Sequence, residues 1–308
     1  MNGTSATGFQ VRRPRAGYQA NTEGQRCYDA PAMPSLHPVR PEAVAGSWYP
    51  GRPEILAKEI DHYLSAVPDA PTEDQVFGLV APHAGLMYSG PVAAWAYRAV
   101  QGADYDVVVL VGPSHRVAFE GVALYPRGAF DTPLGPIPIA ADIADAIRAV
   151  TPVVYDDASA HAPEHSLEMQ LPFLRRVLPD VPIVPLLMGY QSVETIVSLG
   201  AGLATALAGH RALLVASSDL SHYLDARMAS MVDREVTQCV ERFDPECLLD
   251  ILRAKPDHAC GGGPIVSIMR AVRTLGAHAG RVLRYADSGD VSGDKKAVVG
   301  YMAAVFVG

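Results

Sequence analysis

The strongest constraint on the fold is the alternation, from Val44 onward, of short β-branched runs with longer amphipathic segments. This order is typical of a parallel or mixed sheet whose strands are joined by helices. No Pro/Ser-rich linker and no internal repeat divides residues 42–308. We therefore predict an α/β fold, a single domain with a central mixed β-sheet flanked by helices on both faces. Strands are predicted at Val76–Ala81, Val107–Gly112, Ile183–Met188, Ala212–Ser217, Val282–Tyr285 and Ala297–Phe306.

The segments between these strands have helical periodicity. In the last of them, apolar residues recur from Ile265 to Val272 at the i, i+3, i+4 and i+7 spacing of one buried helical face. Helices are predicted at Pro53–Ser65, Gly90–Val100, Ala141–Val150, Glu164–Leu178, Val193–Leu207, Asp225–Glu241, Pro245–Arg253 and Pro264–Leu275.

Residues 1–41 differ in composition from the rest of the chain. Prolines interrupt them repeatedly, arginines outnumber acidic residues, and no apolar periodicity is present. Such a segment has too little apolar surface to offset the entropy of ordering. We predict a disordered N-terminal extension at 1–41 and a folded domain at 42–308.

Composition excludes several classes of partner. Asp and Glu total 33 against 25 Lys and Arg, a formal charge of −8 with no long basic block, so nucleic acid is not expected. No apolar run approaches the roughly 18 residues of a membrane span. The cysteines, at positions 27, 239, 247 and 260, form no CxxC pair or regular framework. We therefore predict a cytoplasmic protein whose cysteines are thiols or metal ligands rather than disulfides.

Polar residues follow the predicted strands at the point where each strand ends. His83 follows the first strand, His115 follows the second, and Asp219 and His222 follow the fourth. Cys260 lies in a glycine-rich turn before the last predicted helix. Ligands of open α/β sheets bind beyond the carboxyl ends of the strands. We expect these side chains to converge in one cleft.

Imidazole nitrogen together with thiolate suits iron, copper or zinc. His83, His115 and Cys260 would form such a site with coordination positions left open. Pro264 fits the first position of the following helix, whose N-terminus would favour the Cys260 thiolate. The alternatives are hydrogen-bonded structural histidines and a small buried cysteine.

Two further pairs of polar residues are spaced three apart. The Asp219 carboxylate could orient the His222 imidazole, or that imidazole could shuttle a proton, whereas the alternative is an aspartate cap on the next turn. His165 and Glu168 would share one face of the predicted helix 164–178, pointing into the cleft or toward solvent.

Residues 161–165 match the H-x-x-E-H signature of inverted zinc proteases. That chemistry needs His161 and His165 on one helical face. Pro163 favours the first helical position, which places His161 outside the helix, so we do not adopt the protease interpretation. Walker, Rossmann and G-x-S-x-G motifs are absent from the sequence.

Taken together, several motifs resemble the Memo family, also called AmmeMemoRadiSam system protein B. They occur in the family's order from about Ala43 to Phe306. The motifs are Ala45–Pro50, Ala81–Gly85 with Tyr88–Pro91, Gly112–His115, Glu164–Glu168 with Gln170–Pro172, Ser217–His222, Ala259–Gly261 and Asp287–Asp290.

This family is similar in fold to the class III extradiol ring-cleavage dioxygenases. The resemblance implies a metal pocket formed by His83, His115 and Cys260. The dioxygenases have a glutamate where Memo-like proteins have the cysteine, a difference that bears on ring cleavage. By the same resemblance, His165 and His222 would bind substrate and transfer protons, and Asp219 would be a pocket acid.

We therefore predict a metal-binding protein, with a non-haem oxidoreductase of the dioxygenase type as the first hypothesis. The cofactor is predicted to be iron, with copper or zinc as alternatives. The family name implies Amme-type and radical-SAM partners. The competing hypotheses are a protein that buffers or delivers iron or copper, a module that docks a peptide, and a zinc hydrolase.

Overall fold

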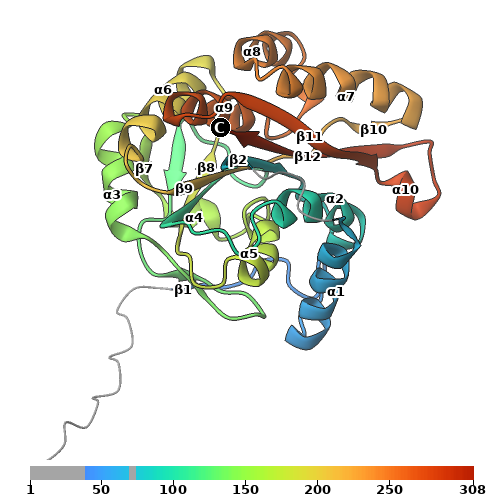
Figure 1. The fold of residues 1–308 in the computed structure, drawn as a ribbon, viewed down its shortest axis with the longest axis horizontal. Helices are drawn as coiled ribbons and strands as arrows, with labels where there is room; N and C mark the ends of the chain where they lie inside the picture. The colour runs from blue at the N-terminus through green and yellow to red at the C-terminus, as the bar shows by residue number, and fades with distance from the viewer. Residues whose placement is uncertain (1–38, 69–73) are drawn as a thin grey trace, which may run out of the picture. The chain divides into compact units, whose positions relative to one another are not determined.

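A computed structural model describes residues 39–68 and 74–308, so all but the last residues of the predicted extension lie outside the described part. A 9-stranded sheet organises the fold (Figure 1). Its strand order is β10 (His222–Leu224), β12 (Val298–Val307), β2 (Val76–Ala81), β9 (Ala212–Ser217), β3 (Val107–Pro113), β8 (Ile183–Met188), β4 (Val122–Leu124) and β7 (Val154–Asp156), and β11 (Ala279–Asp287) pairs with β12.

The sheet is mixed, as predicted. Strands β2, β9, β3 and β8 run parallel, whereas β12 is antiparallel to β2 and β4 is antiparallel to β8. Three of the parallel strands, β2, β8 and β9, have the bounds that the sequence predicts. Their apolar runs are continuous because helices cover both faces of the sheet.

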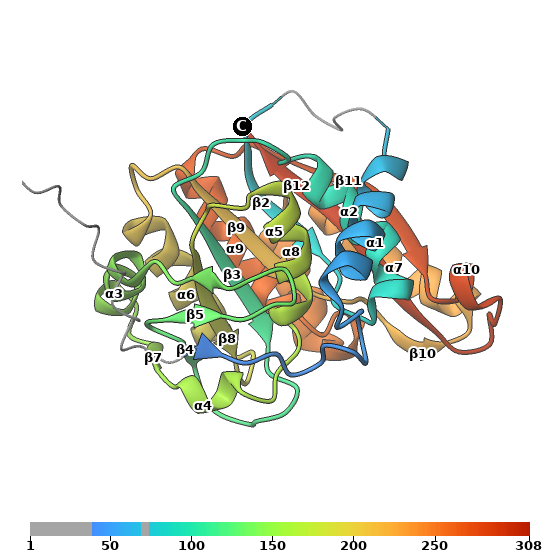
Figure 2. The same cartoon turned by 90° about the horizontal axis from the view of Figure 1, so that it is seen from below.

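Successive residues of each central strand point into two different cores. Leu79 and Leu213 pack into one core, while Val80 and Leu214 pack into the other. The first core contains α1 (Pro53–Ala66), α2 (Leu86–Arg98) and α5 (Leu171–Val177), which cover one face together (Figure 2). The second contains α3 (Ala141–Val150), α6 (Val193–Ala206), α7 (Ala226–Glu241), α8 (Pro245–Ala254) and α9 (Gly262–Leu275).

Short elements complete the described part. Val39 and Arg40, from the predicted extension, form β1 and pair with β5 (Ala129–Phe130). The other short elements are β6 (Ile137–Pro138), α4 (Ala158–His161), α10 (Gly289–Ser292) and the 3₁₀ helices η1 (Glu168–Gln170) and η2 (Pro256–His258). None of the helices in the described ranges is long and apolar enough to span a bilayer.

The predicted helix 164–178 is wrong in its first turn, because residues 164–167 form a non-helical turn and helical structure begins only at η1. Glu164 is the physical cause. Its Oε1 accepts hydrogen bonds from the backbone N–H groups of His165 and Ser166, at 2.9 Å each. A side chain that binds the following N–H groups in this way competes with the helical hydrogen bonds.

Glu168 does not share a face with His165. Its fully buried carboxylate accepts a hydrogen bond from Arg40 Nη1 at 2.6 Å and from Tyr49 Oη at 2.7 Å. It also accepts the backbone N–H groups of Ala43 and Val44, at 2.8 and 3.0 Å. Glu168 therefore anchors the chain that follows β1 onto the sheet's helical layer and takes no part in a cleft.

The expectation that all cysteines are free is also wrong. Cys239 and Cys247 are joined by a disulfide, whereas Cys260 is free. Cys239 lies in the last turn of α7 and Cys247 in the first turn of α8. The short connection between the helices brings their Cα atoms to 5.7 Å, within the range that a disulfide bridges.

We expect Glu168→Ala to lower the free energy of unfolding by about 3–5 kcal/mol, because Arg40 is left as a buried charge without its partner. Urea unfolding followed by circular dichroism measures this. The control is Asp61→Asn, which removes an exposed ion pair with Arg176 and should cost less than about 1 kcal/mol. Equal effects of the two substitutions would show that the Glu168 network is not structural.

We expect His161 to make the fold acid-sensitive. Burial lowers the pKa of His161 from 6.5 to about 4, although its ring hydrogen-bonds the Ala123 carbonyl oxygen. Between these two pH values the unfolded chain binds a proton that the folded chain refuses, so stability falls as pH drops through this window and levels out below it. His161→Gln should remove about 2 kcal/mol of the loss between pH values of about 7 and 5, measured by urea unfolding. The exposed His62→Gln control should leave the slope unchanged.

Candidate metal centre

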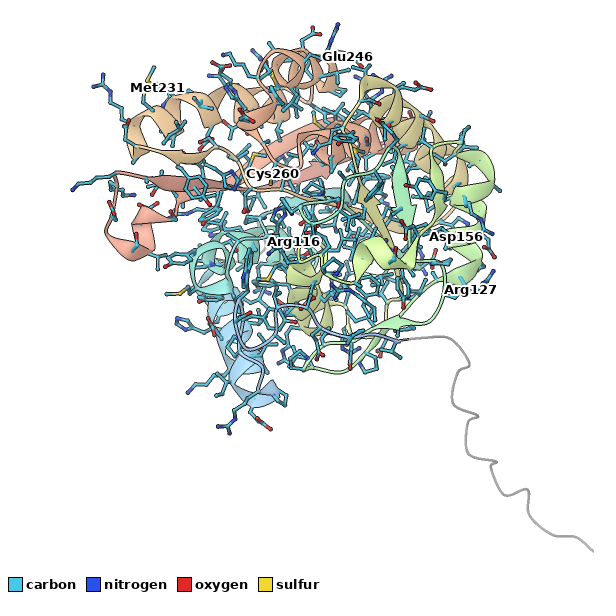
Figure 3. All side chains as sticks on the ribbon, turned by 180° about the vertical axis from the view of Figure 1, so that it is seen from behind. Arg116, Arg127, Asp156, Met231, Glu246 and Cys260 are labelled. Atoms are coloured by element: carbon cyan, nitrogen blue, oxygen red, sulfur yellow. A yellow bond between two sulfur atoms is a disulfide. The ribbon has the colours of Figure 1, made fainter. Side chains whose placement is uncertain are left out.

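The loops that follow β2 and β3 bring two histidines together beyond the carboxyl edge of the sheet. The ring centroids of His83 and His115 are 5.2 Å apart. Cys260, labelled in Figure 3, enters from the turn between η2 and α9. One nitrogen of each histidine and Cys260 Sγ all lie within 4.8 Å of one another. The structure thus places the three predicted metal ligands in one group.

Hydrogen bonds define which nitrogen of His83 is available. Its Nδ1 lies 2.9 Å from Ser217 Oγ, which donates its single proton to the Ser166 carbonyl oxygen and accepts from Gln170 Nε2. Because that proton is already engaged, Ser217 can only accept from His83, so Nδ1 carries the proton. The unprotonated Nε2 therefore faces Cys260 Sγ, 3.2 Å away.

His115 is oriented by a carboxylate. Its Nδ1 lies 2.9 Å from Glu164 Oε1, and its backbone N–H donates to Glu164 Oε2 at 2.6 Å. Burial raises the pKa of Glu164, but the hydrogen bonds and charge of His115 outweigh burial and hold this pKa well below its usual range. An ionised Glu164 keeps the proton of His115 on Nδ1 and leaves Nε2 as the available donor atom.

The turn that carries Glu164 packs tightly against the end of β3. Ser166 Oγ donates to the Pro113 carbonyl oxygen at 2.8 Å. A Cβ at Gly112 would lie 2.7 Å from the Leu167 side chain and 2.9 Å from Ser166 Oγ, so any larger residue there would force these side chains to move.

A second group of donor atoms, from His115, Glu164 and His165, also lies within 4.8 Å. Glu164 Oε1 already accepts hydrogen bonds from the His115 ring and from the backbone of His165 and Ser166. These bonds occupy the carboxylate. We therefore interpret the second group as one that orients His115, and not as a separate ion site.

Cys260 is a partly buried thiol. Burial, together with the charge of Asp219, raises the pKa of Cys260 well above its usual range. These effects favour the thiol in the metal-free protein, whereas the sequence predicted a thiolate, and α9 begins at Gly262 rather than at Pro264. Since His83 Nε2 is unprotonated, it is the acceptor for the thiol proton. Metal binding by Cys260 would require the release of that proton.

Asp219 is a structural neighbour of the ligands. Its Oδ1 accepts the backbone N–H groups of His83 and Ala84, at 2.8 and 3.3 Å, so the predicted alternative of a local turn cap is wrong. Its own backbone N–H points at Cys260 Sγ, at 3.3 Å. Burial raises the pKa of Asp219, while the N–H of His83 opposes the change. Asp219 thereby holds both the His83 loop and the sulfur.

His165 and His222 lie around the same group. The His165 ring lies 4.3 Å from the Trp48 ring and 4.7 Å from the His115 ring, measured between centroids. Burial lowers the pKa of His165 to about 4, so the imidazole is neutral near pH 7. A cavity of about 340 Å³ is lined by these rings, by His222 and by Tyr223.

A second cavity, of about 720 Å³, opens beside Cys260 and shares His115 and His222 with the first. Its far wall contains His258 from η2. The Nδ1 of His258 is buried without a hydrogen bond and lies 3.8 Å from Glu235. Both cavities border the candidate ligands and provide space for an organic ligand.

Several residues of the site were not predicted from the sequence. Glu164 and Ser217 orient the two imidazoles, Trp48 covers His165, and His258 lines the larger cavity. Ser217 carried a usable signal, because it is a polar residue at the end of an apolar strand. The other contacts join distant parts of the chain and have no local signature.

The His161 part of the protease signature lies elsewhere. Its ring packs beside Tyr125 and Phe130, and Nε2 lies 3.0 Å from the Ala123 carbonyl oxygen. His161 therefore shares no group of donor atoms with His165 among the described residues.

Comparison with known proteins identifies the family. The family model described as Memo-like protein matches residues 40–305. The chain belongs to this family. MEMO1 family proteins of Methanosarcina mazei and Thermotoga maritima are 40% and 36% identical to it over 270 and 278 residues. These alignments cover 87% and 86% of this chain, and 98% and 99% of the relatives. The resemblance predicted from the motifs is confirmed.

The fold also resembles a solved structure. An uncharacterized protein from Escherichia coli K12 superposes with a TM-score of 0.52 at 18% identity, covering 75% of this chain and 99% of that one. This likeness supports the predicted α/β architecture.

We expect Glu164→Gln to weaken Zn²⁺ binding by about 10–100-fold, because an uncharged amide no longer holds the proton of His115 on Nδ1 as strongly. Competition with a chromogenic chelator measures the dissociation constant. The control is Glu194→Gln, an exposed substitution in the first turn of α6. An unchanged affinity in Glu164→Gln would contradict the orienting role.

Proposed function

We propose that this Memo-family chain binds a redox-active metal ion through His83, His115 and Cys260 and acts as an oxidoreductase of the dioxygenase type. The carrying observation is that both imidazoles are already held in the tautomer that presents Nε2, with the thiol 3.2 Å from one of them. Two tetrahedral ligands at ordinary zinc bond lengths lie about 3.5 Å apart, so the spacing fits a metal ion with little movement.

An iron or copper ion at this site would supply a Lewis-acidic, redox-active centre next to the two cavities. Dioxygenation of a catechol-like substrate of the extradiol type breaks the carbon–carbon bond between one oxygenated carbon and the adjacent carbon outside the diol, and leaves one atom of O₂ on each of these two carbons. It therefore needs no external reductant, and the structure need supply only binding, orientation and proton transfer.

The chain's own residues support these tasks. His222 lines both cavities and is available as a base for a substrate hydroxyl proton. His165 is neutral and buried, and can donate or accept a hydrogen bond without adding charge. Trp48 contributes an aromatic wall that suits a planar substrate. Asp219 keeps the His83 loop in place while these groups act.

A second candidate is a protein that carries iron or copper without turnover. The soft sulfur of Cys260 favours this alternative, because carriers of Cu(I) and iron commonly use thiolate. It predicts tight binding and release of the ion in a site that does not consume O₂.

The test is metal analysis of untagged protein purified without oxygen, followed by O₂ uptake with a panel of catechols and enediols. Wild type should hold close to one ion per chain, and His83→Ala, His115→Ala and Cys260→Ala should each lose it. His222→Gln should retain the ion and lose at least about 100-fold in O₂ uptake, the scale of a general base.

His278→Ala is the matched control, because His278 is exposed and outside the cavities. Metal binding with no O₂ uptake in any variant would favour the carrier. Absence of metal after reconstitution with iron, copper and zinc would overturn the ligand assignment and favour a pocket that docks a peptide.

A further inference from the structure

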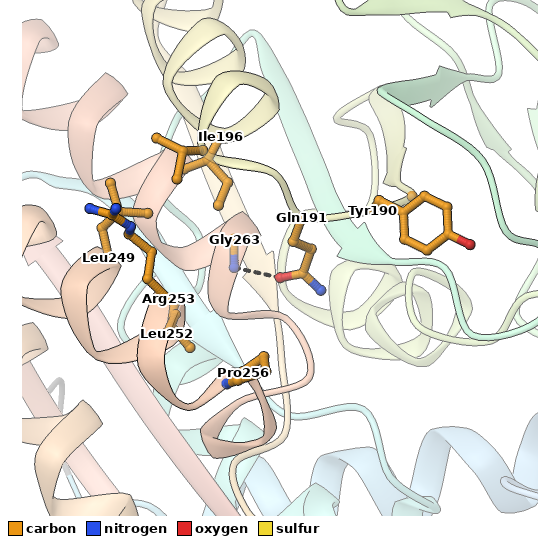
Figure 4. Close-up of a pocket in the computed structure, with 10 residues that line it drawn as sticks. Tyr190, Gln191, Ile196, Leu249, Leu252, Arg253, Pro256 and Gly263 are labelled. Carbon is orange, nitrogen blue, oxygen red and sulfur yellow. Dashed lines mark hydrogen bonds between the residues drawn. The ribbon is translucent and has the colours of Figure 1, made fainter.

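Gln191 bridges the two ends of the turn that carries Cys260. Its Nε2 donates to the Cys260 carbonyl oxygen at 2.6 Å, and its Oε1 accepts the backbone N–H of Gly263 at 2.7 Å. Figure 4 shows the second bond and places Gln191 at the edge of a pocket of about 320 Å³. Gln191 comes from the connection between β8 and α6, far from the turn in sequence.

The rest of the turn is confined by close backbone approaches. A Cβ at Gly261 would lie 2.3 Å from the Ser217 carbonyl oxygen, and the Gly261 N–H donates to Ser218 Oγ at 2.9 Å. A Cβ at Gly262 would lie 2.6 Å from the Leu252 side chain. The end of β9 and α8 thus limit the turn on two sides.

The bonds to Cys260 itself come from two directions. Its backbone N–H donates to the Asp219 carbonyl oxygen at 3.3 Å, and its carbonyl oxygen accepts from Gln191. These bonds hold the peptide groups on either side of the Cα, so together they determine where the sulfur points. Asp219 is buried and also binds the His83 loop, whereas Gln191 is exposed and comes from the connection between β8 and α6.

We propose that Gln191 is a positioning residue that holds Cys260 at the bonding distance of the metal. The inference rests on the proposed metal site and requires no turnover. Outer residues that orient a ligand commonly change metal affinity by 10–100-fold. A purely structural Gln191 would instead stabilise the pocket wall beside Ile196 and Leu252. Its substitution would then lower the free energy of unfolding without changing the bond between the Cys260 sulfur and the metal.

Two measurements on the full-length chain separate these roles. The first is Co²⁺ titration of wild type, Gln191→Leu, Cys260→Ser and Gln191→Leu in a Cys260→Ser background. Competition with a chromogenic chelator gives the dissociation constant of each, and the thiolate-to-cobalt charge-transfer absorption is recorded in the two proteins that keep Cys260. We expect Gln191→Leu to raise the Co²⁺ dissociation constant about 10–100-fold and to weaken the charge-transfer band at saturation. In the Cys260→Ser background the same substitution should change the dissociation constant less than about 2-fold, because the group through which it acts is absent.

The second measurement needs no metal. Alkylation of metal-free protein by iodoacetamide, followed by mass spectrometry of the Cys260 peptide, should be at least about 10-fold faster in Gln191→Leu, because the turn opens more often. Gln101→Leu is the control, since it removes an exposed side-chain hydrogen bond to Arg98.

The outcomes distinguish this inference from the proposed function. Wild-type protein that fails to bind Co²⁺ through sulfur would refute the metal site and with it the positioning role. A wild-type thiolate band that Gln191→Leu leaves unchanged in strength and affinity would overturn only the role of Gln191. Unchanged alkylation, or an equal loss of affinity in the Cys260→Ser background, would also overturn it.

Discussion

At the edge of the apolar sheet, buried polar groups must find hydrogen-bond partners within the protein. The geometry of the site depends on this requirement. Ser217, at the end of β9, is fully buried, and its hydroxyl bonds to His83, Ser166 and Gln170 at once. Leaving any of these groups unpaired would cost about 1–3 kcal/mol, so the arrangement is strongly specified. The hydrogen bonds that satisfy the Ser217 hydroxyl also fix the His83 proton on Nδ1. The same bonds therefore stabilise the fold and leave Nε2 of His83 free to bind a ligand.

The strands were predictable because each central strand is buried on both faces. A continuous apolar run such as Ile183–Met188 is buried along its whole length, and its bounds can be read from where the apolar residues begin and end. The turn at Glu164 was not predictable in this way. The apolar residues after it keep helical spacing, and the preference for a turn arises from a carboxylate that also binds His115, 49 residues away. The disulfide was not predicted because its cysteines are 8 residues apart and lie at the end of one helix and the start of the next. The turn between the helices, which brings them together, has no cysteine signature in the sequence.

The candidate metal ligands were predicted from a general property of parallel sheets. Side chains that follow adjacent parallel strands must meet at one edge, and β2, β9 and β3 are adjacent. Among the residues that orient the ligands, Ser217 follows this rule because it ends β9, whereas Glu164 and Gln191 do not. Glu164 and Gln191 act through hydrogen bonds between segments that only the complete fold brings together. Sequence thus predicts which atoms gather, whereas structure is needed to see which protonation state and direction they take.

The three candidate ligands differ in how the fold supports them. His83 and His115 follow central strands, so their positions are tied to the two cores. Cys260 lies on a turn between η2 and α9 that is held by Asp219 on one side and Gln191 on the other. Local opening of such a turn costs less than moving a central strand. Of the three candidate ligands, Cys260 is therefore the one whose position the fold restrains least.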